Sequence, residues 1–227
     1  CVLCAVLSQP LRREMDADRE PTHPVHIGSL VRPIRLVLAH RSLSTMAACS
    51  FMFSMVQMSL TTYLVTYLNQ DLAFGLVAAG LALSVAQMGG VSGRIVWGYV
   101  ADRWLGASRT LMLLAVLMVS AALATALLSA TMPRWLLVGV LVVFGASAIG
   151  WNGVYLAEVA RRAPAGQASL ATGGTLAFTF LGVVIGPPVF GLLATVFGTY
   201  RAGFIALMAV ASLCGLLLFR LRRAAPA

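Results

Sequence analysis

The chain has 227 residues, of which 60% are hydrophobic and only 10% are charged, and its mean hydropathy is +0.92. A soluble domain carries about 25% charged residues, so this composition excludes an ordinary soluble protein, because such a chain could not cover its surface with polar groups. The net charge of +9 comes from arginine alone, and no nucleic-acid partner is expected, because the arginines separate apolar runs and form no patch with interleaved aromatic residues.

The first 41 residues are expected to precede the main membrane domain. Residues 1–9 look like the end of an earlier transmembrane helix, so we expect the protein to start further upstream. Residues 10–41 are predicted to be a polar linker with a short amphipathic piece at its end, because a charged run is followed by several prolines. Cys1 and Cys4 have no partner pair, and His23 and His26 are interpreted as solvated, so no metal site or cofactor is predicted.

Six apolar runs follow, and each can cross about 30 Å of hydrocarbon, which takes about 20 helical residues. The runs are 42–70, 72–93 with an extension to about 100, 110–133, 135–157, 163–200 and 202–219. They predict an all-α integral membrane domain of six transmembrane helices over residues 42–223, with a tail of residues 224–227.

The distribution of arginine predicts the orientation of this domain. Thirteen of the 16 arginines fall on the side of the linker and the carboxy terminus, and only Arg134 and Arg201 fall on the opposite side. Since basic residues collect in cytoplasmic loops, we expect the linker and the carboxy terminus to be cytoplasmic in a multi-pass protein of the inner (plasma) membrane.

An internal repeat relates the second and fifth spans. A shift of 93 residues places Gly93 on Gly186 and Gly98 on Gly191, and the first and third spans then match the fourth and sixth. Each unit has three helices, so the two units are oppositely oriented. The sequence therefore predicts two inverted three-helix repeats, an architecture typical of transporters.

Polar side chains gather at helical spacing on four of the six spans. Buried amides and charges in a membrane are costly and usually face a cavity or a partner, although serine and threonine also serve as ordinary contacts between helices. The candidates for lining a substrate cavity are Gln57, Thr61, Gln87, Arg94, Trp151, Asn152 and Tyr155.

Residues 98–109 read GYVADRWLGASR, and this stretch resembles the G-x-L-A-D-R-x-G-R signature of the major facilitator superfamily. The positions that match the signature are Gly98, Asp102, Arg103, Gly106 and Arg109. The departures are one inserted leucine and the pair Ala-Ser before the last arginine. The resemblance implies a cytoplasmic loop that latches one state of the transport cycle. Gly98 is expected to allow a close contact between helices.

Two further stretches are similar to the same family. Residues 186–191 resemble the Gly-Pro motif of its eleventh helix, and Glu158 followed by Arg161 and Arg162 resembles the end of its tenth helix, which would join the latch. The resemblance implies that residues 1–9 end helix six and that residues 42–223 hold helices seven to twelve. A complete member has twelve helices, so the amino-terminal six-helix half is an expected partner.

Arg94 is similar to an arginine of helix eight in monocarboxylate-type members, which is implicated in binding the carboxylate of the substrate. Those relatives carry an aspartate one turn earlier, where this sequence has Gly90. Two roles are open for Arg94: binding an anion through its planar fork, or joining a structural cluster with Asp102 and Glu158.

The predicted function is secondary active transport of a small solute, a small organic anion by preference, across the lipid bilayer by alternating access. Export of drug-like or apolar compounds is the first alternative, and a non-transporting half-protein or gene fragment is the second. Protons are a candidate coupling ion for symport or antiport, without an assigned residue. An enzyme is not expected: Gly90-Val-Ser92-Gly93 matches the motif of rhomboid-type proteases, but the last histidine, His40, precedes the first full span.

Overall fold

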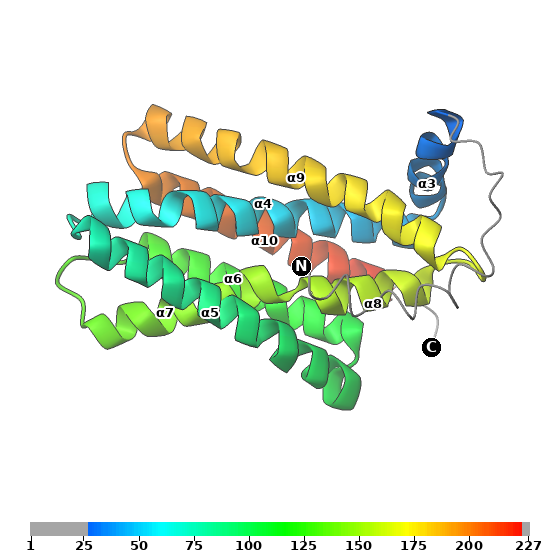
Figure 1. The fold of residues 1–227 in the computed structure, drawn as a ribbon, viewed down its shortest axis with the longest axis horizontal. Coiled ribbons are helices and arrows are strands. Elements are labelled where there is room, and N and C mark those ends of the chain that lie inside the picture. The colour runs from blue at the N-terminus through cyan, green and yellow to red at the C-terminus, as the bar shows by residue number, and fades with distance from the viewer. Residues whose placement is uncertain (1–26, 224–227) are drawn as a thin grey trace, which may run out of the picture. The chain divides into compact units, whose positions relative to one another are not determined.

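A computed structural model describes residues 27–223 of the chain, and all regular secondary structure in this range is helical (Figure 1). The elements are α3 (Ile27–Ala39), α4 (Arg41–Gln70), α5 (Leu76–Val100), the π-helical turn η1 (Ala101–Leu105), α6 (Ala107–Ala126), α7 (Arg134–Gly150), α8 (Asn152–Arg162), α9 (Ala168–Phe197) and α10 (Tyr200–Arg223). The predicted end of helix six, most of the predicted linker and the tail lie outside these residues. Contacts are described below for the compact unit that begins at Arg32.

Six helices in this range are long and apolar enough to cross a membrane, which confirms the predicted fold class. Two of them combine elements: α5 continues through η1, and α7 continues through α8 after an interruption at Trp151. The backbone of Trp151 stays in the right-handed helical region, so the chain keeps helical dihedral angles across the interruption. The third span ends at Ala126, earlier than the apolar run suggests, because the chain turns through a loop before Pro133 precedes α7.

Helices α5 and α7 lie side by side and touch through backbone atoms (Figure 1). A Cβ atom added to Gly89 would lie 2.6 Å from the carbonyl oxygen of Val142, and one added to Gly93 would lie 2.6 Å from that of Ala146. Only glycine fits at such positions, and small residues are what allow helices to approach closely inside a membrane.

Helices α4 and α9 form the equivalent pair. A Cβ atom added to Gly182 would meet the backbone of Phe51, and one added to Gly186 would meet that of Met55. These glycines follow their counterparts on α5 by 93 residues, and the contacted positions on α7 follow those on α4 by 91 residues. The same contact is therefore built twice, as expected for two inverted three-helix repeats.

The turn η1 accommodates the residue inserted in the 98–109 motif. The N–H of Gly106 donates to the carbonyl oxygen of Ala101 at 3.0 Å, which is an i to i−5 bond and gives room for Leu105. Gly106 then leaves the helix with φ at +75° and ψ at 154°, a conformation that glycine adopts far more readily than other residues. The glycine of the motif is thus needed to end the turn.

At the opposite end of the bundle, Asp71 ties α4 to α10. One of its carboxylate oxygens accepts hydrogen bonds from the hydroxyl of Thr199 at 2.7 Å and from the N–H of Tyr200 at 2.8 Å. The carboxylate thereby meets the positive end of the α10 helix dipole. Arg201 also donates to the carbonyl oxygen of Leu128 at 2.9 Å, which secures the loop after α6.

The substitution Gly145→Ala should lower stability by about 1–3 kcal/mol, because the added methyl group would collide with the backbone of Ala86 on α5 and overpack the interface. Gly139→Ala on the same helix is the matched control, since a Cβ atom there meets nothing within 4 Å. The measurement is the fraction of purified protein that remains monodisperse in detergent after heating. Equal losses for both variants would show that α5 and α7 are not in backbone contact.

Candidate functional site

A polar group lies at the interruption between α7 and α8. The side-chain oxygen of Gln57, on α4, accepts hydrogen bonds from the indole N–H of Trp151 at 3.0 Å and from the amide of Asn152 at 3.4 Å. Because an indole N–H can only donate, the contact fixes which end of the Gln57 amide is the oxygen. Three of the predicted cavity residues are therefore brought together.

Arg94 joins this group from α5 through the carbonyl oxygen of Ile149. Its Nε donates to that oxygen at 3.4 Å, and the amide of Asn152 donates to the same oxygen at 3.4 Å. One turn further along α5, the indole of Trp97 donates to the carbonyl oxygen of Ala146 at 2.9 Å. Two side chains of α5 thus hold the last turn of α7.

The packing of α7 also leaves no room for a side chain at Gly90, where the resemblance to monocarboxylate-type members would have an aspartate. A Cβ atom at Gly90 would lie 2.6 Å from the Cβ atom of Ile149, so α7 fills the space that a side chain would need. Within residues 27–223, Arg94 forms no ion pair with Asp102 or Glu158. The expected structural cluster of these three residues is not present in this part of the chain.

The polar group has spare donors. Across the described range, the side-chain nitrogen of Gln57 and the two terminal nitrogens of Arg94 donate to no protein atom, whereas the side-chain oxygen of Gln57 and the carbonyl oxygen of Ile149 each accept two bonds. Arg94 is exposed and Gln57 is half-buried. The side-chain oxygen of Asn152 is an acceptor that receives no hydrogen bond from the described residues, so open donors still outnumber open side-chain acceptors in the group. Such a group is suited to a ligand that accepts hydrogen bonds.

The remaining cavity candidates lie around this group in different ways. Thr61 is half-buried and donates to backbone carbonyls of its own helix, and Gln87 is exposed on α5. Trp151 and Tyr155 are buried, at 0% and 1% exposure, and their rings contact each other with centroids 5.2 Å apart. In this conformation Trp151 donates to Gln57, and Tyr155 packs against the ring of Trp151. The predicted part of both residues in lining a cavity stays a prediction.

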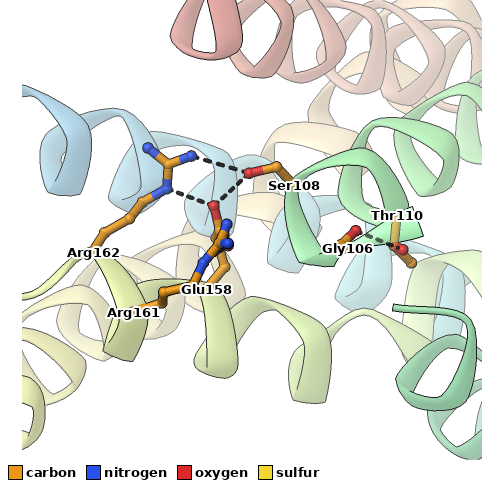
Figure 2. Close-up of polar contacts among 6 residues, drawn as sticks. All are labelled: Gly106, Ser108, Thr110, Glu158, Arg161 and Arg162. Atoms are coloured by element: carbon orange, nitrogen blue, oxygen red, sulfur yellow. Dashed lines mark hydrogen bonds and ion pairs between the residues drawn. The ribbon is translucent and has the colours of Figure 1, made fainter. Parts of the chain in front are cut away.

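Glu158 forms a second polar cluster at the end of α8 (Figure 2). Its carboxylate is fully buried and binds Arg161 at 2.5 Å and Arg162 at 2.6 Å. Ser108, at the start of α6, donates a hydrogen bond to the same carboxylate and accepts one from Arg162 at 3.0 Å. The cluster joins α8 to the loop that carries the 98–109 motif.

Sequence reasoning did not single out Ser108, although a signal was available. Ser108 belongs to the Ala-Ser pair that departs from the family signature, and this departure supplies the hydroxyl that meets Glu158. By contrast, the charged side chains of Asp102, Arg103 and Arg109 are exposed and form no ion pair with any described residue. Their predicted latching role stays a prediction.

The prediction of a close helix contact at Gly98 is wrong for this structure. A Cβ atom added there meets nothing within 4 Å. The close approach of α5 to α7 occurs five to nine residues earlier, at Gly89, Gly90 and Gly93, and α7 ends at Gly150, which packs against Gly93.

Comparison with known proteins places these features in a family. The profile of the Major Facilitator Superfamily matches residues 1–175. The fold is similar to that in a crystal structure of the E. coli fucose:proton symporter FucP, with a TM-score of 0.68 and 16% sequence identity, over 84% of this chain and 44% of that chain. This chain thus spans less than half the length of the symporter, and no curated protein sequence matches it. Because the family profile covers most of the chain and the six-helix fold agrees, the chain belongs to the Major Facilitator Superfamily.

Proposed function

We propose that this chain is the carboxy-terminal half of a secondary transporter that moves a small organic anion across the plasma membrane by alternating access. The observation that carries the proposal is the set of open donors on Arg94 and Gln57 beside acceptors that are already occupied. A carboxylate would accept hydrogen bonds from these open donors. Membership of the family supports transport in general, and the substrate class rests on this polar group alone.

The chemistry of arginine favours a carboxylate over a neutral solute at this position. Among residues 27–223, the guanidinium of Arg94 is held through Nε alone, so its two terminal nitrogens can act as a planar fork that binds both oxygens of a carboxylate. Such bonds are roughly twice as strong as those between neutral groups. The similarity to a fucose symporter at 16% identity supports the fold. Fucose is therefore not assigned as a substrate of this chain.

The second half of the proposed transporter would cover α5 and α9. Both helices expose many large apolar side chains, including Val77 and Ile95 on α5 and Phe180 and Val184 on α9. An amino-terminal half could pack on these faces and close the cavity over Arg94 and Gln57. Export of apolar compounds has less support, because the largest aromatic cavity candidate, Trp151, is fully buried and offers no apolar surface in this conformation.

The orientation proposed for this half puts the end with Glu158 in the cytoplasm, as the distribution of arginine predicts. The fixed cluster of Glu158, Arg161, Arg162 and Ser108 would then hold α8 against the 98–109 loop. The exposed charges of that loop, Asp102 among them, would be free to pair with the amino-terminal half in one state of the cycle. Protons remain a candidate coupling ion.

Arg94→Ala should reduce uptake of a labelled monocarboxylate by at least about tenfold, because one charge-assisted hydrogen bond contributes about 1.5–3 kcal/mol. Arg94→Lys should recover only part of the uptake, since an ammonium group cannot bind both oxygens in a plane. The measurement is initial uptake in cells that express the chain together with its amino-terminal half.

Arg134→Ala is the matched control for this experiment, because Arg134 is an exposed arginine at the other end of α7. Its uptake should equal that of the unsubstituted protein. Unchanged uptake by Arg94→Ala, at equal amounts of protein in the membrane, would remove Arg94 from the substrate site and with it the assignment of an anionic substrate.

Glu158 and Asp102, two acidic residues at or near the 98–109 motif, should respond differently to loss of their charge. Glu158→Gln should lower stability by about 3 kcal/mol, because it leaves the guanidinium of Arg162, which is 19% exposed, without its carboxylate. Asp102→Asn should leave stability unchanged but slow transport, since Asp102 has no partner in the described half. Heating of the purified protein and initial uptake rates measure the two effects. A stable Glu158→Gln variant would contradict the structural role given to the cluster.

A further inference from the structure

A cavity of about 410 Å³ opens at the end of the bundle where α4 begins and where α8 and α10 end. Arg41, Arg162 and Arg220 line it, one from each of these helices. None of the residues proposed to bind the transported solute contributes to it. The cavity is therefore a feature separate from the substrate site.

The charges around this cavity are not balanced by the described residues. No acidic side chain is among the residues of 27–223 that line it. Arg162 is paired with Glu158, but that carboxylate also binds Arg161, so one negative charge serves two guanidinium groups. Arg41 and Arg220 are exposed and have no ion-pair partner among residues 27–223. Like charges around one cavity repel each other, and an anion between them would relieve that repulsion.

The first turn of α4 adds further donors to the same cavity. Arg41 is the first residue of the helix, and the preceding His40 makes no side-chain hydrogen bond to its end. The N–H groups of the first turn are consequently left without side-chain partners, at the positive end of a helix of 30 residues. The hydroxyl of Ser42, which also lines the cavity, donates to no described residue.

The remaining lining consists of Thr45 on α4 and two leucines on α10, which form an apolar wall. Leu217 and Leu221 line it from the last turns of α10, next to Arg220. The site thus combines a cationic rim with an apolar wall at the end of membrane-spanning helices. That combination matches a phosphate group attached to an acyl chain better than a free ion, because basic pockets between helix ends bind the headgroups of anionic lipids.

We propose that this cavity binds the phosphate of an anionic phospholipid, with Arg41, Arg162 and Arg220 around the phosphate and an acyl chain against Leu217 and Leu221. The phosphate places one negative charge among these guanidinium groups, which lowers their mutual repulsion, and it joins the ends of α4, α8 and α10. Its headgroup occupies a position outside the transport path, so it is a structural ligand and is not carried across the membrane.

The test is a titration of the purified protein in detergent with phosphatidylglycerol, followed by native mass spectrometry. Phosphatidylcholine with the same acyl chains is the neutral reference, and inorganic phosphate in excess is the competitor. Arg220→Gln and Arg41→Gln should each weaken phosphatidylglycerol binding by about tenfold. Arg222→Gln is the matched control, because it removes the same charge two residues away on α10 without touching the cavity, and it should change binding by less than about threefold.

Each variant is first compared with the unsubstituted protein by elution volume and thermal stability, so that loss of binding is separated from loss of folding. Arg220→Lys is a second variant that keeps the charge, and it should bind more tightly than Arg220→Gln. Equal binding by Arg220→Gln, Arg41→Gln and Arg222→Gln would overturn the proposal. So would binding of inorganic phosphate without a preference for phosphatidylglycerol over phosphatidylcholine, which would make the ligand a soluble anion.

Discussion

Backbone contact through glycine is the constraint on which the other features of this bundle depend. Inside a bilayer, apolar side chains gain little by leaving lipid for protein, so helices associate where small residues let their backbones pack closely. Gly89 and Gly93 provide this contact between α5 and α7, and Gly182 and Gly186 provide it between α4 and α9. The close approach of α5 also brings Arg94 within reach of the carbonyl oxygen of Ile149. The polar group is a consequence of the packing.

The ligand preference proposed for the polar group follows from which of its donors and acceptors already form hydrogen bonds. The indole of Trp151 has a single donor and no acceptor, and it takes the oxygen of Gln57. Asn152 and Arg94 together occupy the Ile149 carbonyl oxygen. Among the described residues, the oxygens of Gln57 and Ile149 are thereby occupied, and open donors are left in excess. The balance of donors and acceptors is thus set by residues on three helices, and it gives the proposed preference for an anion.

Much of the fold could be predicted from the sequence, because apolar run length and glycine spacing report directly on membrane helices and their repeat. The candidate site was harder to predict from the sequence. Periodicity showed that Trp151 and Tyr155 share a helix face, but it could not tell whether that face meets a cavity or a neighbouring helix, and both residues are buried. Ser108 and Asp71 act through contacts with residues 50 and 128 positions away, which no local pattern reveals.

The wide turn at η1 has a consequence for the helix that follows it. One extra residue in an α-helix rotates every later side chain by about 100° around the axis. Here the additional leucine lies within the π-helical turn, before Gly106. Helix α6 therefore starts in the orientation in which it contacts α10 and in which Ser108 faces Glu158. A change in chain length has been confined to five residues, which lets the loop vary while the membrane helices on either side keep their register.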